Sequence, residues 1–318
     1  MLTSVEVCAG AGGQALGLEK AGFEHIRLVE LEPVACQTLR YNRPNWNVIE
    51  GDLRNFSAID LKGVDLVAGG VPCPPFSKAG KQLGKDDERD LFPEAIRLVD
   101  ECRPKAVMLE NVRGLLDSVF DEYRANLIRD LKQLGYVAEW RLLNASDYGV
   151  CQLRPRVLFV ALRQDFAGHF RWPEPNQFSP ITVGELLHDL MSENGWLGAD
   201  AWRERACDIA PTLVGGSKKH GGPDLGPTRA KRAWESLGVD GKGIADAPPV
   251  RDFIGLPRLT TRMAARIQGF PDDWVFSGKK TATYRQIGNA FPPPVAASVG
   301  NCIRAAINAA SKPKLKRA

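Results

Sequence analysis

The heptapeptide Val71-Pro-Cys-Pro-Pro-Phe-Ser77 offers the strongest candidate nucleophile of the chain, the thiol of Cys73. It follows the apolar run Leu66–Ala68, which is typical of a buried strand. Cys73 is therefore expected at the carboxyl end of a strand, where open α/β sheets bind their ligands. Prolines on both sides of the cysteine restrict the backbone, which favours a fixed geometry of attack. The competing interpretation is a buried structural cysteine in a proline-rich turn.

A carboxyl group closes the next predicted strand. Ala106–Leu109 is apolar, and Glu110 and Asn111 follow it at the same edge of the predicted sheet. Burial would raise the pKa of Glu110 and let this carboxyl donate or accept a proton near neutrality. Capping of a following helix is the alternative role for Asn111.

Two arginines open a further predicted strand. In Gln152-Leu-Arg-Pro-Arg156, the guanidinium groups of Arg154 and Arg156 are expected on one side of an extended chain, because they stand at positions i and i+2. Their forked donors match an oxyanion or a phosphate. A solvated strand edge is the more usual context for such a pair.

A glycine-rich turn near the N-terminus predicts a site for a nucleotide-like cofactor. The segment Ala9-Gly-Ala-Gly-Gly13 lies between the predicted strand Ser4–Cys8 and a helix-like run. At Gly10, Gly12 and Gly13 the backbone can approach a ligand closely, and the helix N-terminus favours negative charge. A tight turn without any ligand is the alternative.

Two acids follow the second and third predicted strands at positions that suit a nucleotide. Glu30 stands about 20 residues after the turn, where a carboxylate could bind a ribose hydroxyl. Asp52 follows the third strand and could accept a hydrogen bond from an adenine amine. These features fit a dinucleotide as well as S-adenosylmethionine, so they leave the cofactor open.

The elements that position these residues are predicted from apolar, β-rich runs that alternate with helix-like stretches. This alternation is typical of the α/β class, with a mostly parallel sheet covered by helices on both faces. The predicted strands are Ser4–Cys8, Ile26–Val29, Val48–Glu50, Leu66–Ala68, Ala106–Leu109, Val137–Leu142 and Val157–Leu162.

The alternation stops between about Trp172 and Pro257, where proline, glycine and short charged stretches predominate. A segment of that length without a regular pattern predicts a second, smaller and irregular domain. Helical periodicity returns at Thr261–Gln268 and at Pro294–Asn308, and the last helix is expected to pack on the first domain. The basic tail Lys312–Arg317 is expected to be disordered.

Composition narrows the class of protein. Of 318 residues, 44% are hydrophobic and 25% charged, as in ordinary globular proteins. No apolar run approaches the roughly 20 residues of a membrane helix, and no secretory signal is recognised, so a cytoplasmic protein is expected. The seven cysteines form no CxxC pair, which argues against a disulfide framework and a zinc site. The net charge of +4 permits a polyanionic partner without requiring one.

Taken in order, the motifs closely resemble those of the C5-cytosine DNA methyltransferase family, of the prokaryotic restriction–modification type. They are AGAGG, PCPPFS, ENV, QLRPR and the segments Arg258–Pro271 and Tyr284–Pro294. Any one motif could occur by chance, but six in the family's order could hardly do so. The resemblance covers nearly the whole chain except about Trp172 to Pro257, where the family has its variable target recognition domain.

The resemblance implies a Rossmann-like, S-adenosylmethionine-dependent methyltransferase fold with a smaller, irregular target recognition domain. It also implies a division of the chain. The catalytic and cofactor-binding domain takes 1–171, the target recognition domain 172–257, a hinge and linking motif 258–280, a C-terminal motif and helix 281–310, and a basic tail 311–318.

Transferred residue by residue, the resemblance makes Cys73 the nucleophile that attacks C6 of a cytosine. Glu110 is expected to bind the base at N3 and its amino group, and Arg156, with Arg154 in support, to steady it at O2. Attack at C6 makes C5 nucleophilic enough to accept the methyl group of S-adenosylmethionine. Since neither carbon is accessible inside a duplex, the cytosine must be flipped out of double-stranded DNA.

For the cofactor, the resemblance assigns Glu30 to the ribose, Asp52 to the adenine and Asn289 to the methionine end. Gly10, Gly12 and Gly13 form the loop beside them.

The chain departs from the family at three positions. Glu6 and Cys8 stand where aspartate and phenylalanine are common, and Pro74 stands where a glutamine follows the nucleophile. The first change keeps a carboxylate, whereas the second removes a ring that could stack on adenine. Activity is expected to survive these changes.

The predicted target recognition domain contains one basic cluster. Within Ser217–Arg232, five basic side chains accompany a single acid, Asp224. Glycine loops that carry Lys and Arg suit groove entry and phosphate contact, and Arg can recognise guanine by two hydrogen bonds. A solvated charged loop is the alternative. The residues expected to bind DNA are Ser77, Lys218, Lys219, Arg229, Lys231 and Arg232.

Three other functions are compatible with parts of the sequence. An NAD-dependent dehydrogenase would use the glycine turn but leaves PCPPFS, ENV and QLRPR without a role. A catalytically silent DNA-binding protein needs no nucleophile. An RNA cytosine methyltransferase would perform the same chemistry, although the Cys-Phe-Thr signature of its tRNA-methylating branch is not found. The expected partners are double-stranded DNA and, without a stable complex, a restriction endonuclease of the same site; a monomer that binds no metal is expected.

Overall fold

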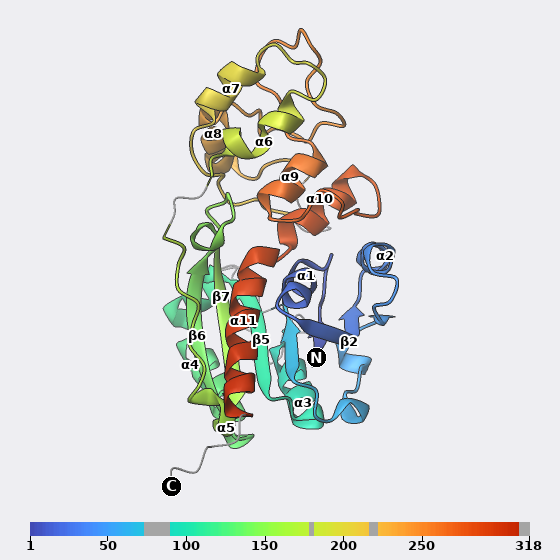
Figure 1. Cartoon of the computed structure of the whole chain (residues 1–318), viewed down its shortest axis with the longest axis vertical. Helices are drawn as coiled ribbons and strands as arrows, with labels where there is room; N and C mark the ends of the chain where they lie inside the picture. The colour runs from blue at the N-terminus through green and yellow to red at the C-terminus, as the bar shows by residue number, and fades with distance from the viewer. Residues whose placement is uncertain (73–89, 178–180, 216–221, 312–318) are drawn as a thin grey trace.

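The computed structural model of the chain describes residues 1–72, 90–177, 181–215 and 222–311. Its larger part is a sheet with helices on both faces, and a smaller helical part stands at one end (Figure 1). Several residues singled out from the sequence lie outside the described residues, namely Cys73, Pro74, Ser77, Lys218, Lys219 and the tail 312–318.

The sheet has seven strands in the order β3-β2-β1-β4-β5-β7-β6. Neighbouring strands are parallel, except that β7 runs antiparallel to both β5 and β6. The predicted α/β fold with a mostly parallel sheet is thereby confirmed. The strands are β1 Leu2–Val7, β2 Phe23–Glu30, β3 Val48–Glu50, β4 Leu66–Gly69, β5 Ala106–Val112, β6 Tyr136–Asn144 and β7 Pro155–Arg163.

Helices connect most of these strands, and further helices follow β7, with turns and irregular chain between them. Short 3-10 turns occupy Leu53–Asn55, Ile59–Leu61, Arg113–Leu116, Ser118–Phe120 and Ala145–Tyr148. The α-helices are α1 Gly13–Lys20, α2 Pro33–Asn42, α3 Phe92–Cys102, α4 Asp121–Gln133, α5 Gln164–Ala167, α6 Val183–Met191, α7 Ala199–Arg205, α8 Thr228–Ser236, α9 Thr261–Ile267, α10 Lys280–Asn289 and α11 Pro293–Ala310.

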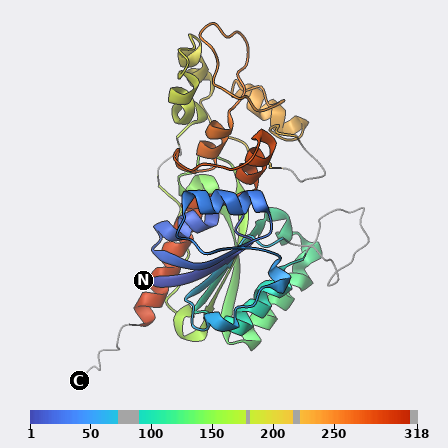
Figure 2. The ribbon, with the colours of Figure 1, turned by 90° about the vertical axis from the view of Figure 1, so that its right-hand side faces the viewer.

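Side chains that alternate along β5 show how both faces of the sheet are covered. Val107 and Leu109 belong to a core formed with α3 and α4. Ala106 and Met108 point to the opposite face and share a core with α1 and α11. Because both faces are buried, the strand is a continuous apolar run rather than an alternating one. Figures 1 and 2 show α11 lying along the sheet beside α1, so the end of the chain contacts its beginning.

The strand order reverses between β1 and β4, which are neighbours in the sheet but not in the sequence. The connection after β1 leads to β2 on one side, and the connection after β4 leads to β5 on the other. Loops that leave two adjacent strands in opposite directions open a crevice at their carboxyl ends, and open α/β sheets bind ligands there. The glycine turn and the segment containing Pro72 both start at this point.

The described part of the region 172–257 contains three short helices that the sequence analysis did not predict, joined by irregular chain. α6, α7 and α8 lie here, and each is only 7–9 residues long. Such helices do not fill the window of about 11–18 residues over which helical periodicity is detected. α6 is nevertheless marked by a capping box, in which Thr182 and Glu185 exchange hydrogen bonds. Trp202 and Trp234 are buried in a core that continues into α9 and α10.

None of the helices within the described ranges is both long and apolar enough to span a membrane. All six cysteines in those ranges are free thiols. The same part of the chain contains no group of three or more His, Cys, Asp or Glu side chains that could hold a metal ion.

Candidate active site

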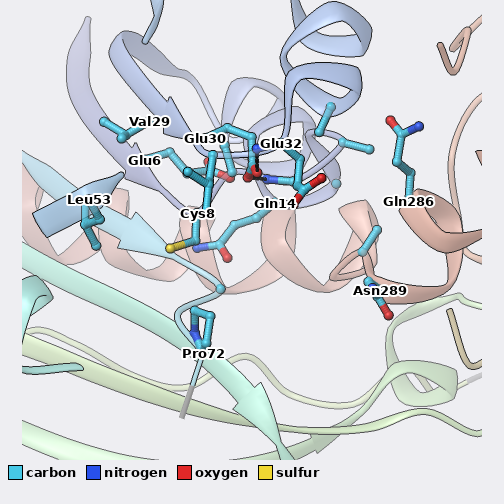
Figure 3. Close-up of a pocket in the computed structure, with 18 of the residues that line it drawn as sticks. Glu6, Cys8, Gln14, Val29, Glu30, Glu32, Leu53, Pro72, Gln286 and Asn289 are labelled. Carbon is cyan, nitrogen blue, oxygen red and sulfur yellow. Dashed lines mark hydrogen bonds between the residues drawn. The ribbon is translucent and has the colours of Figure 1, made fainter. Parts of the chain in front are cut away.

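The crevice between β1 and β4 contains a pocket of about 640 Å³ at the carboxyl edge of the sheet (Figure 3). Small-molecule sites typically measure about 300–1,000 Å³, so this pocket can take one cofactor. In Figure 3, Glu6, Cys8 and Glu30 lie on the β1 and β2 side of the pocket, and Asn289 lies across from Leu53. The predicted site residues that the pocket brings together are Gly10, Gly13, Glu30, Asp52, Glu110 and Asn289.

The glycines of the turn have different structural tasks. Gly10 has a φ of +55°, and its N–H donates to Glu30 Oε2 over 2.7 Å, which ties the turn to the end of β2. Gly12 has a φ of +84°, and a Cβ there would lie 2.7 Å from an α2 side chain. Gly12 therefore serves packing and turn geometry and does not line the pocket. A Cβ at Gly13 would lie 2.2 Å from the carbonyl oxygen of Phe291, so only glycine fits there.

Glu30 is held at the pocket wall by two backbone donors. Its Oε2 accepts from the Gly10 N–H at 2.7 Å, and its Oε1 accepts from the Glu32 N–H at 2.8 Å. Burial raises the pKa of Glu30, whereas these N–H groups lower it. Because a carboxylate has about four acceptor positions, each oxygen can accept a further hydrogen bond from a hydroxyl of a ligand.

Asp52 stands at the rim of the pocket and is paired with Arg54. The two side chains approach to 2.6 Å, and Asp52 also accepts from the Arg54 backbone N–H at the start of the 3-10 turn. The hydrogen bonds with Arg54 lower the pKa of Asp52, which keeps this carboxylate an acceptor at neutral pH. Its position suits a hydrogen bond from an amine of a ligand at the mouth of the pocket.

The two departures from the family that the structure describes, Glu6 and Cys8, both line the pocket. Glu6 is 1% exposed, and burial raises its pKa well above the ordinary value, an effect that the backbone N–H of Ala15 partly offsets. Cys8 adopts a φ of +50°, and burial raises its pKa to about 12. Cys8 is thus a neutral thiol that shapes the pocket wall and is a poor nucleophile.

Glu110 and Arg156 form an ion pair, with 2.9 Å between Glu110 Oε1 and Arg156 Nε. Glu110 lies opposite Leu158 and Arg156 lies opposite Val112 in the pairing of β5 with β7, so the two are diagonal neighbours on one face. Glu110 is therefore inside β5 rather than after it. Burial raises the pKa of Glu110, and Arg156 offsets part of this rise. A raised pKa favours the protonated form of this carboxyl, which is the form that a general acid requires.

Arg154 lies just before the strand that contains Arg156. It precedes β7 and is 0% exposed. Its guanidinium donates to the carbonyl oxygens of Leu213 and Gly288 at 2.7 Å and of Ala290 at 3.0 Å. These donors are used by the protein backbone, so Arg154 does not offer a second fork to an oxyanion. The structure corrects the expected start of the strand, because β7 begins at Pro155 rather than at Gln152.

Asn111 has a function that the sequence did not reveal. Its Nδ2 donates to the carbonyl oxygen of Val71 over 2.8 Å, two residues before Cys73. Pro72 lines the pocket, and its carbonyl oxygen accepts from the Leu91 N–H at 3.1 Å. Both described ends of the segment that contains Cys73 are therefore fixed beside the pocket. The alternative role considered for Asn111, capping of a following helix, is not observed.

The described part of the basic cluster lies on a helix rather than on a glycine loop, which corrects that expectation. Arg229, Lys231 and Arg232 belong to α8. Arg229 and Arg232 are exposed and, at positions i and i+3, share one helix face. Lys231 is half-buried and pairs with Asp224 at 2.8 Å, so it is engaged within the protein.

Comparison with known proteins adds a sequence relationship to this geometry. Residues 2–305 match the model of the C-5 cytosine-specific DNA methylase family. Type II methyltransferase M.NgoMIV of Neisseria gonorrhoeae is 64% identical over 304 residues, covering 95% of this chain and 96% of that protein. Type II methyltransferase M.NaeI of Lentzea aerocolonigenes is 60% identical over 313 residues, covering 96% of this chain and 76% of that protein.

Solved structures show the same fold at lower identity. The Dnmt2 methyltransferase of S. pombe superimposes with a TM-score of 0.66 at 17% identity, covering 97% of this chain and 100% of the other. A mutant of DNMT2 from Spodoptera frugiperda superimposes with a TM-score of 0.67 at 17% identity, with coverages of 96% and 100%.

Proposed function

Since the chain belongs to the C-5 cytosine-specific DNA methylase family, we propose that it is the modification enzyme of a Type II restriction–modification system. It methylates C5 of a flipped-out cytosine in duplex DNA through a bond between Cys73 and C6. One observation carries this proposal: the pocket beside the glycine turn extends to Glu110, which is paired with Arg156, so cofactor and base chemistry would share one crevice.

S-adenosylmethionine fits the residues that form the pocket. Gly10 allows close approach of the backbone, Glu30 has acceptor positions left for a ribose, and Asp52 is an ionised acceptor at the rim. Asn289 would contact the methionine end from α10. When bound, this cofactor supplies an electrophilic methyl group.

The chemistry of the base rests on the residues of the chain. The thiolate of Cys73 attacks C6, and the electron pair of the 5,6 double bond becomes available at C5. Glu110 donates a proton or hydrogen bond to N3, and the Arg156 guanidinium offsets the negative charge that develops at O2. After C5 is methylated, a water molecule takes the C5 proton, and the electron pair of that C–H bond reforms the 5,6 double bond. Cys73 leaves C6 as a thiolate, and N3 returns its proton to Glu110. The target must leave the stacked duplex, because C5 and C6 are not accessible within it.

The division of the chain follows from the same proposal. Residues 1–171 and 281–310 form the catalytic part, 172–257 recognise the target, 258–280 link the two, and 311–318 are a basic tail. The enzyme acts as a monomer in the cytoplasm, and a restriction endonuclease of the same site is its functional counterpart without a stable complex.

Bisulfite sequencing of host DNA after expression of the chain tests this function. We expect one short sequence to carry 5-methylcytosine throughout the genome, and expression of Cys73→Ala to leave the same sequence unmodified. Methylated host RNA with unmethylated DNA would show that the substrate of the chain is RNA. Absence of methylation in both polymers, from folded protein that binds S-adenosylhomocysteine, would contradict the proposal.

A further inference from the structure

One face of α10 forms a wall of the pocket. The residues of this helix that line the pocket stand at positions i, i+3, i+4 and i+7, which places them on one side of the helix: Ala282, Arg285, Gln286 and Asn289. In Figure 3, Gln286 and Asn289 project from α10 across the pocket from Leu53. The side chains of this face are therefore the groups of α10 that a bound cofactor would meet.

The position of α10 is fixed by contacts with two other segments. Gln286 Oε1 accepts from Thr38 Oγ1 on α2 at 2.7 Å, and Gln286 Nε2 donates to the carbonyl oxygen of Ser277 at 2.8 Å. Elsewhere on the helix, a Cβ at Gly215 would lie 2.6 Å from the carbonyl oxygen of Arg285. Gln286 is thus engaged within the protein, and the backbone that carries Arg285 has little room to move.

The pocket contains more carboxyl groups than cations. Its described lining has two cations, Arg54 and Arg285, and five carboxyl groups, which belong to Glu6, Glu30, Glu32, Asp52 and Glu110. Arg54 is paired with Asp52 at 2.6 Å. Arg285 is half-buried, and no hydrogen bond or ion pair joins its guanidinium to another residue within the described ranges. In that part of the chain, Arg285 is therefore the pocket cation that is available to a ligand.

The charge of the expected ligand complements this cation. S-adenosylmethionine and S-adenosylhomocysteine each carry one anionic group, the carboxylate of the amino-acid end. Among several carboxyl groups such an anion is repelled unless a cation lies beside it. Asn289, which the proposed function assigns to the methionine end, lies one helical turn from Arg285 on the same face. The forked donors of a guanidinium match a carboxylate with two parallel hydrogen bonds.

We propose that Arg285 binds the carboxylate of the cofactor, so that the pocket selects adenosine derivatives with an intact amino-acid end. The inference rests on the proposed function, because it takes S-adenosylmethionine as the ligand of the pocket. In this role Arg285 binds and orients the cofactor and does not contact the cytosine. A decarboxylated cofactor should therefore bind less tightly, although it keeps the adenosine and the amine.

The test measures by calorimetry the dissociation constants of S-adenosylhomocysteine and of its decarboxylated analogue. The unaltered chain should bind S-adenosylhomocysteine about tenfold more tightly than the analogue, because only the first ligand can pair with the guanidinium. In Arg285→Gln, the affinity for S-adenosylhomocysteine should fall about tenfold, while the affinity for the analogue changes by less than about twofold. Arg285→Lys keeps the charge without the fork, so its preference for the carboxylate should lie between those of the unaltered chain and Arg285→Gln.

Arg54→Gln is the matched control, because Arg54 is the other cation of the described lining and is paired with Asp52. Both ligands carry the same adenosine, so this variant should weaken both by the same factor and keep the ratio of their dissociation constants. Circular dichroism shows that each variant is folded.

An unchanged affinity of folded Arg285→Gln for S-adenosylhomocysteine overturns the inference. An equal loss of affinity for both ligands also overturns it, because Arg285 would then act on the shape of the pocket rather than on the carboxylate. Equal affinities of the unaltered chain for the two ligands contradict the inference without any variant. Failure of the proposed function has a different signature: the unaltered chain would bind neither ligand.

Discussion

The sheet edge and the helical region 181–257 position their side chains by different means. At the sheet edge, the register of β5 against β7 fixes Glu110 and Arg156 on one buried face. In the helical region, Arg229 and Arg232 project from a short helix whose other face is anchored by Trp234. The first arrangement restricts each functional group to one position, whereas the second presents exposed cations on a surface.

This difference has a consequence for substitutions. A buried group that acts on reacting atoms has no neighbour that can replace it, so its loss acts on the rate. An exposed cation that contacts DNA shares its task with others, so its loss acts on affinity or sequence preference. The expected effects therefore decrease from the sheet edge to the surface of α8.

The largest effect is expected for Cys73→Ala. Because only the covalent step needs the sulfur, methylation should fall by at least about a thousandfold while binding of S-adenosylhomocysteine is retained. Turnover is measured by transfer of a labelled methyl group to DNA, and binding by calorimetry. Cys151→Ala and Cys207→Ala are the controls, with one buried thiol and one exposed thiol, and both should remain active. A dead Cys151→Ala beside an active Cys73→Ala would place the nucleophile elsewhere.

The next largest effect is expected for Glu110→Gln, a loss of about a hundredfold or more in kcat/KM. Burial raises the pKa of Glu110, so its proton is bound at low pH and lost as the pH rises through this raised value. If the protonated form acts on N3, activity falls as the pH rises through this value. The amide of the variant does not titrate, so the same limb should disappear from its profile. Persistence of the limb would assign it to another group.

A smaller effect is expected for Glu30→Gln, in which one acceptor and the charge are lost. Hydrogen bonds to charged groups contribute about 1.5–3 kcal/mol, so the dissociation constant of S-adenosylhomocysteine should rise at least about tenfold. Asp52→Asn should weaken binding less, because Asp52 is at the rim and already paired with Arg54. Calorimetry on both variants checks the order of the two losses in affinity. A larger loss for Asp52→Asn would argue against binding of the ribose by Glu30.

The same contrast decides how much of the molecule could be predicted from the sequence. The strands and Glu110 were predictable because buried parallel strands are continuous apolar runs and their carboxyl ends define the site. The backbone partners of Arg154 and Asn111 could not be predicted, since only tertiary packing brings Leu213, Gly288 and Val71 to these side chains. The helices of 172–257 were missed because they are too short for their periodicity to be detected.

The smallest effect is expected on α8 and tests whether its surface recognises bases. Arginine bound to guanine contributes about 1–3 kcal/mol against a wrong base, whereas lysine on phosphate weakens all sequences alike and reduces the salt dependence. Alanine at Arg229 or Arg232 should therefore lower the ratio of methylation rates on cognate and singly mismatched duplexes. The loss of discrimination should lie near the lower end of that range of free energy, because both side chains are exposed. Alanine at Lys218 or Lys219 should lower affinity and the salt slope while this ratio is kept.

Lys231→Ala is the matched control on the same helix, because Lys231 is paired with Asp224. If none of these substitutions changes the rate ratio or the salt slope at fixed temperature, base recognition lies elsewhere in 172–257 and the cluster is a solvated surface.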